Sequence, residues 1–389
     1  MTSDLESRIR VLIVDDSSVM RRIIINALEK QPEVEVIGTA ANGKQAIDLV
    51  NQLRPDLITL DIEMPEMDGL TALREIRKVH KRMPIIMFST LTHKGAQAAV
   101  MALTAGATDY VGKPTTSAGS IEGAFKVLED ELIPKVIGLG LRVKRQVSLQ
   151  PTKTVAEAKP VNPVVSASTR AIENVSSIVP KTAAAHSLTP ASAQAVVIGI
   201  STGGPMALMH LFSAFNAVLS VPVFVVQHMP PTFTTLLAAR LTTAGLMTVK
   251  EPEEGEMPEA GTVYMAPGGF HMKLVREGAK VVMRLTTEAP ENSCRPAADV
   301  LFRSAAAIYE SGLLAVVMTG MGQDGLKGCQ EVKRYQGQVI AQDEASSVIW
   351  GMPQAVVKQG LADTVLPLND IADEIVFRTR TSARNVAKD

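Results

Sequence analysis

Short apolar runs alternate with stretches of helical periodicity over the first 113 residues. The apolar runs are rich in aliphatic and β-branched residues and predict buried strands, which lie at 10–14, 34–39, 57–60, 84–88 and 110–112. Apolar residues at helical spacing, as in 20–28 and 43–53, separate them. Alternation of this kind demands a parallel sheet with right-handed crossovers. The carboxyl ends of its strands should therefore share one edge.

The same pattern returns after residue 193. Apolar runs predict further strands at 195–200, 221–226, 262–266, 313–318 and 338–341. Between 139 and 192 the periodicity fails and Pro, Ala, Ser and Thr dominate, a composition that cannot bury enough apolar area to offset its ordering entropy. The sequence thus predicts an α/β protein with two doubly wound, mainly parallel sheets, at 8–138 and 193–385, joined by a flexible linker at 139–192.

Composition and charge narrow the class of protein. A chain of 389 residues that is 46% hydrophobic is long enough for two full cores. Its 39 basic and 40 acidic residues show no basic cluster of the kind that binds nucleic acid. Two cysteines in such a length suggest a reducing compartment. With no signal-peptide pattern and no apolar run near the roughly 20 residues that span a bilayer, we expect a cytoplasmic protein without membrane insertion.

Polar side chains mark the strand ends of the first sheet. The positions at these ends are Asp15, Asp16, Asp61, Ser89 and Lys113. Carboxylates held together repel one another unless a divalent cation shares them, and a hard ion such as Mg2+ fits oxygen ligands. In this interpretation Asp61 attacks an incoming phosphoryl group, and Lys113 pairs with the acyl phosphate. The alternative is a set of solvated loop acids beside a surface lysine.

The second sheet begins with a serine at a strand-to-helix turn. The pattern Gly199-x-Ser201-x-Gly203 matches the nucleophile-elbow motif, and Pro205 is typical of a first helical turn. Serine at a helix start also commonly caps the helix, so the motif alone leaves both roles open.

Two further side chains follow strand ends of the same sheet. His228 comes directly after the strand at 221–226, and Asp324 follows the strand at 313–318. In nucleophilic acyl transfer, His228 would deprotonate Ser201 and Asp324 would orient the imidazole. Backbone N–H groups at Thr202 and around Met321 could receive the oxyanion. The order Ser, His, Asp differs from that of α/β-hydrolases, so we reject that fold.

Other residues compete for these roles. The competitors are His271 for the base, Asp343 and Glu344 for the acid, and Cys294 and Cys329 as nucleophiles. The histidine has a longer offset from its strand, and neither cysteine lies at a strand-to-helix turn.

The first segment resembles the receiver domain of two-component response regulators, which has a flavodoxin-like fold. The resemblance covers about residues 8 to 135 and is carried by Asp15-Asp16, Asp61 to Pro65, Ser89 and Lys113-Pro114. It implies that Asp61 is the phospho-acceptor. It also implies that Asp15, Asp16, Asp61 and the backbone carbonyl of Glu63 surround Mg2+.

The receiver resemblance assigns further roles. Ser89 and Tyr110 match the switch hydroxyl and switch aromatic, and Lys113 belongs to the same switch apparatus. The implied phosphate donor is the phosphohistidine of a chemotaxis kinase.

The last segment resembles the chemotaxis protein-glutamate methylesterase domain, with a Rossmann-like fold. The matching motifs are Gly199 to Gly204, Gln227 to Pro231, Ala266 to Gly268 with His271, Arg295-Pro296, and Gly320 to Gly325. The resemblance covers about residues 193 to 385 and implies the triad Ser201, His228 and Asp324 without a cofactor for the esterase chemistry. It implies demethylation of glutamate methyl esters on chemoreceptors, release of methanol and deamidation of receptor glutamines.

Small departures from the family pattern occur at Ile200, Gln323 and Ser293-Cys294. They affect the expected substrate fit and rate. Two rival hypotheses remain: a module that binds a nucleotide phosphate at the Ser201 turn without cleaving a bond, and a lipase-like esterase for small substrates.

Overall fold

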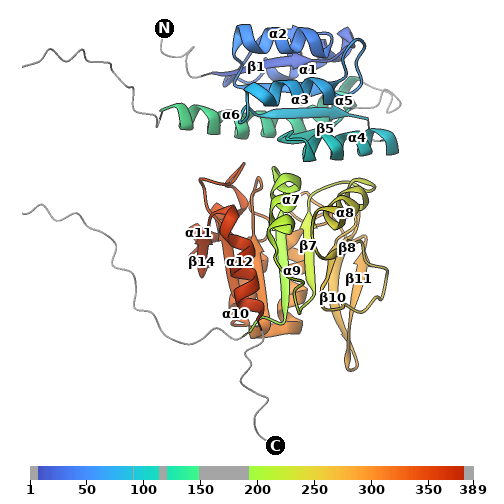
Figure 1. Cartoon of the computed structure of the whole chain (residues 1–389), viewed down its shortest axis with the longest axis vertical. Coiled ribbons are helices and arrows are strands. Elements are labelled where there is room, and N and C mark those ends of the chain that lie inside the picture. The colour runs from blue at the N-terminus through green and yellow to red at the C-terminus, as the bar shows by residue number, and fades with distance from the viewer. Residues whose placement is uncertain (1–7, 91, 114–120, 149–191, 381–389) are drawn as a thin grey trace, which may run out of the picture.

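Two parallel sheets, each flanked by helices, form the two halves of the molecule (Figure 1). The computed structural model describes residues 8–90, 92–113, 121–148 and 192–380. The predicted fold class, two mainly parallel α/β sheets, is confirmed. The linker prediction for 149–191 lies outside the described residues.

The first half has a five-stranded sheet of order β2-β1-β3-β4-β5. Its strands are β1 (Ile9–Val14), β2 (Val34–Ala40), β3 (Leu57–Asp61), β4 (Ile85–Ser89) and β5 (Asp109–Gly112). Its helices are α1 (Ser18–Leu28), α2 (Gly43–Leu53), α3 (Gly69–Val79), α4 (His93–Thr104), α5 (Ile121–Val127) and α6 (Ile133–Ser148), with a π-helical turn η2 (Leu128–Leu132) before α6.

The second half has a seven-stranded sheet of order β14-β13-β12-β6-β7-β9-β8. Its strands are β6 (Ala195–Ile200), β7 (Val223–Gln227), β8 (Thr248–Lys250), β9 (Thr262–Met265), β12 (Leu313–Val317), β13 (Gln338–Gln342) and β14 (Thr364–Leu366). An antiparallel hairpin stands apart, formed by β10 (His271–Glu277) and β11 (Lys280–Thr286). The helices are α7 (Gly204–Ala214), α8 (Phe233–Ala244), α9 (Ala298–Tyr309), α10 (Leu326–Arg334), α11 (Met352–Lys358) and α12 (Leu368–Thr379), with a 3-10 turn η3 (Glu310–Gly312).

Alternation along β6 explains why this sheet is covered on both faces. Val196, Ile198 and Ile200 belong to a core cluster that includes residues of α7, α8 and α12. Ala195 and Val197 belong to the cluster formed with α9 and α10. Because successive side chains of a strand point to opposite faces, a continuous apolar run is the signature of a strand buried on both sides.

The direction of the chain reverses beside β6 in the second sheet. From β6 the chain moves outward to β7, and it later returns on the other side through β12. The carboxyl ends of β6 and β12 therefore border the crevice where open α/β sheets bind ligands. In the first sheet the corresponding switch lies between β1 and β3.

The predicted boundary at residue 138 falls inside a helix. α6 continues to Ser148 and packs against β1, and a Cβ on Gly140 would lie 2.3 Å from Ile9. The first half thus reaches ten residues beyond the predicted 138, into the span assigned to the linker at 139–192. A long amphipathic helix was missed because its glycines and basic residues weaken the apolar periodicity.

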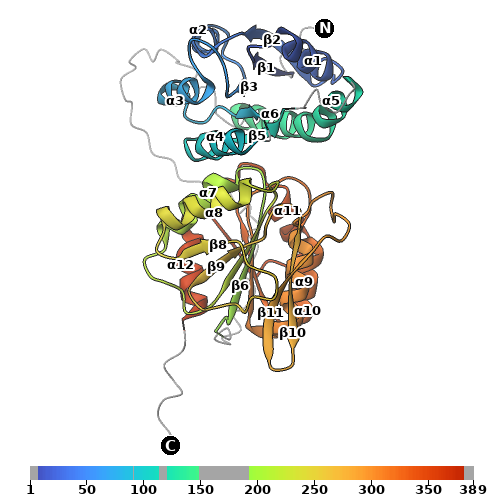
Figure 2. The same cartoon turned by 90° about the vertical axis from the view of Figure 1, so that its right-hand side faces the viewer.

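The first half rests on the end of the second half where α7 and α8 begin (Figure 2). α4 contacts both of these helices. The Arg142 guanidinium of α6 donates a hydrogen bond of 2.9 Å to the Val348 carbonyl. Among the described helices, none is both long and apolar enough to cross a bilayer.

Candidate active site and phosphorylation site

Ser201 and His228 follow two neighbouring strands in matched register. Ile200 of β6 pairs with Gln227 of β7, and each polar residue comes one position later. The His228 N–H donates to the Ile200 carbonyl at 3.3 Å, which fixes the two chain ends beside each other. The turn after Ser201 begins α7 through Gly203, whose φ of 77° is in the left-handed region that favours glycine.

Asp324 is the best-satisfied carboxylate of the site. It is 2% exposed, and its Oδ2 lies 2.7 Å from Nε2 of His228. The N–H groups of Ala298 and Asp299, in the first turn of α9, donate to its two oxygens at 2.6 and 3.0 Å. A helix N-terminus favours negative charge, so this placement holds Asp324 ionised.

The carboxylate of Asp324 raises the pKa of His228. Burial opposes protonation of the imidazole, but hydrogen bonds to Asp324 and Cys294 outweigh it and raise the pKa of His228 to about 10. Burial alone would raise the pKa of Asp324, whereas its hydrogen bond with His228 and those from the α9 backbone lower it below the ordinary value. Since Nε2 faces Asp324, Nδ1 is the ring nitrogen that remains for other partners, and the described structure shows no hydrogen bond between it and Ser201.

The Ser201 hydroxyl itself makes no hydrogen bond within the described residues. Its backbone is held by N–H donation to the Thr319 carbonyl at 3.0 Å. The N–H groups of Thr202 and Met321 also donate to no group in the described part of the chain. A Cβ on Gly320 would lie 2.8 Å from the Ser201 Cβ, so the loop after β12 closely approaches the serine.

Three of the competing residues, His271, Asp343 and Cys329, have partners or surroundings away from His228. His271 is fully buried, and its Nε2 lies 3.1 Å from the Ala289 carbonyl. Asp343 accepts hydrogen bonds from the N–H and hydroxyl of Ser346. Cys329 lies in the core under α10, where burial raises the pKa of its thiol. None of the three contacts His228 through a hydrogen bond that the described structure contains.

The first sheet gathers its own charged cluster. Lys113 Nζ lies 3.0 Å from Asp15 Oδ2 and 2.6 Å from Asp61 Oδ2. Carboxylate oxygens of Asp15, Asp16 and Asp61 lie within 4.8 Å of one another. Four of the five predicted strand-end residues of this sheet, Asp15, Asp16, Asp61 and Lys113, therefore converge.

Known proteins match both halves of the chain. Residues 196–375 match the family model of the CheB methylesterase, and residues 11–122 match that of the response regulator receiver domain. The protein-glutamate methylesterase/protein-glutamine glutaminase of Trichodesmium erythraeum is 46% identical over 95% of this chain and 99% of its own length. The enzyme of the same description from a Nocardioides species is also 46% identical, over 95% of both chains.

The chain belongs to this methylesterase family. Both resemblances drawn from the sequence motifs are thereby confirmed. A solved structure, the CheB methylesterase catalytic domain of Thermotoga maritima, is 45% identical over 48% of this chain and 98% of that chain, with a TM-score of 0.47. We call residues 8–148 the receiver and residues 192–380 the esterase domain.

The acidic cluster of the receiver suits a hard divalent cation. Burial raises the pKa of Asp61 to about 6, although the Lys113 hydrogen bond lowers it and Asp15 raises it further. One lysine thus leaves the three carboxylates incompletely neutralised. Asp15, Asp16 and Asp61 would hold Mg2+, which prefers oxygen ligands, and the donor set fits the ion that a receiver domain typically uses.

Two of the three predicted switch residues, Ser89 and Tyr110, face different partners. The Ser89 hydroxyl is buried and donates to the Gly95 carbonyl of α4 at 2.7 Å. The Tyr110 ring stacks on Phe233, the first residue of α8, with ring centroids 4.6 Å apart. Tyr110 therefore contacts the esterase domain five residues after His228.

Sequence reasoning missed Asn292 altogether and considered Cys294 only as a nucleophile, not as a neighbour of His228. Asn292 Nδ2 donates to Asp324 Oδ1 at 2.8 Å and to Asp299 Oδ2 at 2.9 Å, bridging two buried acids. Cys294 contributes to the raised pKa of His228. Both lie on an irregular loop in which Asn292 has a φ of 52°, and no periodic pattern marks such a loop. The family motif ending at Arg295-Pro296 was the available signal.

Proposed function

We propose that the protein is a phosphorylation-activated protein-glutamate methylesterase and glutaminase that acts on chemoreceptors through Ser201, His228 and Asp324. The supporting observation is the 2.7 Å contact between His228 and Asp324 at a strand end adjacent to that of Ser201. Acyl transfer by a serine requires a hydroxyl nucleophile, a base that deprotonates it and a carboxylate that orients the base.

The residues divide the chemistry among them. Ser201 Oγ attacks the ester carbonyl while His228 Nδ1 takes its proton, and Asp324 stabilises the imidazolium. The N–H groups of Thr202 and Met321 hold the oxyanion; one such donor typically contributes about 2.7–4 kcal/mol. His228 returns the proton to the departing methoxide, which leaves as methanol. Water then cleaves the acyl-enzyme, and a glutamine side chain follows the same path with loss of ammonia.

The raised pKa of His228 bears on its protonation in the resting protein. An imidazolium cannot accept the Ser201 proton, and a pKa of about 10 favours that form at neutral pH. In the arrangement described here the ring side chain is only 12% exposed. Because Tyr110 of the receiver stacks on Phe233, five residues after His228, we expect substrate entry to need a movement of the receiver.

Phosphorylation of Asp61 supplies that movement. A chemotaxis histidine kinase donates the phosphoryl group, Asp61 accepts it, and Lys113 pairs with the product. Mg2+ held by Asp15, Asp16, Asp61 and the Glu63 carbonyl would neutralise the phosphoryl oxygens. Ser89 then exchanges its bond with α4 for the phosphoryl group.

The expected output is a change in the Tyr110–Phe233 contact between the domains. α4, which carries the Ser89 acceptor Gly95, also contacts α7 and α8 of the esterase domain. Coupling of this kind requires contacts that differ between two states. We expect the protein to act in the cytoplasm, where the kinase and the modified receptor segments would be accessible.

Release of methanol from methyl-labelled receptor tests both halves of the proposal. Ser201→Ala should lower the rate by a factor on the order of 10^4 or more, as loss of a triad nucleophile does. Ser213→Ala, on the outer part of α7, is the matched control and should retain activity. Full activity in Ser201→Ala would reject the acyl-enzyme on this serine, whereas a wild-type protein that releases no methanol would favour a module that binds without cleaving a bond.

The regulatory half has its own readout. Acetyl phosphate should stimulate the wild-type protein, and Asp61→Asn should keep the basal rate without stimulation. Stimulation that survives in Asp61→Asn would reject the switch while leaving the esterase assignment intact.

A further inference from the structure

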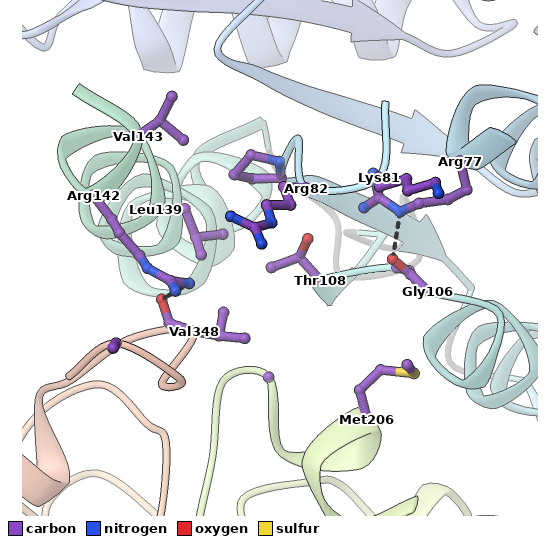
Figure 3. A pocket seen from close by; sticks show the side chains of 14 residues that line it. Arg77, Lys81, Arg82, Gly106, Thr108, Leu139, Arg142, Val143, Met206 and Val348 are labelled. Carbon is purple, nitrogen blue, oxygen red and sulfur yellow. Dashed lines mark hydrogen bonds between the residues drawn. The ribbon is translucent and has the colours of Figure 1, made fainter. Parts of the chain in front are cut away.

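A cavity of about 410 Å³ lies between the receiver and the esterase domain (Figure 3). Its receiver wall comes from the end of α3, the loop before β4, the α4–β5 loop and α6. Its esterase wall comes from Gly203 and Met206 at the start of α7 and from Ala345 and Val348 in the loop after β13. The cavity therefore exists only while the two domains are docked.

Four basic side chains line this cavity from the receiver side. They are Arg77, Lys81, Arg82 and Arg142. Arg77 donates to the Gly106 and His80 carbonyls, and Arg142 donates to the Val348 carbonyl, so each of these two guanidinium groups is held in place. Figure 3 shows the Arg82 guanidinium extending toward the space between Arg142 and Thr108.

No carboxylate is among the residues that line the cavity. Lys81 and Arg82 form neither a hydrogen bond nor an ion pair within the described ranges of the chain. The unpaired charge of Arg82 affects Arg142. Burial and then the neighbouring Arg82 lower the pKa of Arg142, and only Glu344, an exposed residue of the esterase loop, raises it. Uncompensated like charges around a partly enclosed space create a strong preference for an anion.

We propose that this interdomain cavity binds a small polyanion carrying phosphate groups. Guanidinium groups present paired N–H donors that match phosphate oxygens bidentately, and three of the four cationic side chains are arginines. The volume falls in the range of small-molecule sites.

The location gives such an anion a defined effect. Its receiver-side contacts are ionic and its remaining contacts are with the start of α7 and the loop after β13, so it binds the docked arrangement better than separated domains. By linkage, the bound polyanion stabilises the docked state. This ligand site is separate from the Asp61 cluster and from the triad.

Calorimetric titration of the full chain with inorganic tripolyphosphate tests the proposal, in Mg2+-free buffer so that the Asp61 cluster does not interfere. Arg82→Gln and Arg142→Gln should each weaken binding by about tenfold, the scale of one lost charge-assisted hydrogen bond. Arg74→Gln, an exposed position of α3 outside the cavity, is the matched control and should change the affinity less than twofold.

Two further arms test the chemistry and the shared wall. ATP should bind and citrate should bind more weakly, because phosphate matches the arginine donors better; equal binding of citrate would overturn the phosphate assignment. Met206→Glu adds a negative charge on the esterase wall and should weaken binding about tenfold. Unchanged affinity in Met206→Glu would overturn the interdomain location, and unchanged affinity in Arg82→Gln would overturn the site.

Discussion

The two sheets of this protein both place carboxylates at the carboxyl ends of their strands or beyond them, but neutralise these carboxylates differently. In the receiver, Asp15 and Asp61 share a single lysine. In the esterase domain, Asp324 accepts hydrogen bonds from a histidine, an asparagine and three backbone N–H groups. Two similar sheets therefore hold one carboxylate whose charge is only partly neutralised, Asp61, and one whose oxygens are fully hydrogen-bonded, Asp324.

The difference is visible in the pKa values and suits each acid to the chemistry proposed for it. Burial raises the pKa of Asp61 to about 6, whereas the donors around Asp324 lower its pKa despite burial. An acid that lacks neutralisation attracts a cation and then a phosphoryl group. An acid that is fully hydrogen-bonded keeps its charge and fixes an imidazole. Neighbouring donors, more than topology, decide the function of each strand end.

The largest expected effect comes from removing the charge of Asp324. Asp324→Asn should lower methanol release by roughly 10^3–10^4-fold, the scale seen when a triad carboxylate becomes an amide. It should also lower the pKa of His228 from about 10 toward its ordinary 6.5, because the ion pair that raises it is lost. NMR titration of the histidine ring measures the pKa, and labelled-methanol assays measure the rate.

A second variant separates the effect of the Asp324 charge on His228 from the effect of the neighbouring Cys294. Cys294→Ala removes the second group that raises the pKa of His228, so it should lower this pKa by less than Asp324→Asn and retain activity. A His228 pKa near 6.5 in the wild-type protein would contradict the conclusion that Asp324 is ionised and paired with His228. Because the folded pKa lies above the unfolded one, the associated stability is present below pH 6.5 and is lost as the pH rises toward 10.

A medium effect is expected on Mg2+ affinity as the pH falls. Binding requires ionised Asp61, and a pKa of about 6 means that only about one tenth of it is ionised at pH 5. Affinity should therefore fall by about tenfold between pH 7 and pH 5, whereas a carboxyl with the ordinary pKa of 3.8 would lose almost none. Calorimetric titration of Mg2+ at the two pH values measures the difference.

Asp61→Asn provides the control for this pH dependence. It should bind Mg2+ more weakly at pH 7 and lose most of the further weakening at pH 5, leaving only the contribution of Asp15, whose pKa burial also raises. A wild-type affinity that is flat between pH 7 and pH 5 would contradict the under-neutralised description of the receiver cluster.

Strand-end reasoning predicted these sites because parallel strands bring distant residues to one edge. The pairing of Ile200 with Gln227 follows from two apolar runs, and it places His228 beside Ser201. The donors to Asp324 from α9 could not be predicted in the same way. They depend on where an irregular loop delivers the start of a helix, which a single sequence does not encode as a period.

The contact between domains was the least predictable feature. The helix α6 looked like the start of a tether, yet it packs on β1 and reaches Val348 of the esterase domain. Packing between domains depends on complementary surfaces rather than on apolar periodicity. The residues that matter, such as Tyr110 and Phe233, carry no local sequence signal for each other.

The smallest expected effect tests how the two halves communicate. Tyr110→Ala removes one ring of the stack with Phe233, and such pairs contribute about 0.5–1.5 kcal/mol. If docking restrains the esterase, basal methanol release should rise by about twofold to tenfold, and stimulation by acetyl phosphate should shrink correspondingly. Tyr110→Phe keeps the ring and should behave like the wild type. A Tyr110→Ala protein with unchanged basal rate and full stimulation would show that the Tyr110–Phe233 stack carries no signal from Asp61 in the receiver to Asp324 in the esterase domain.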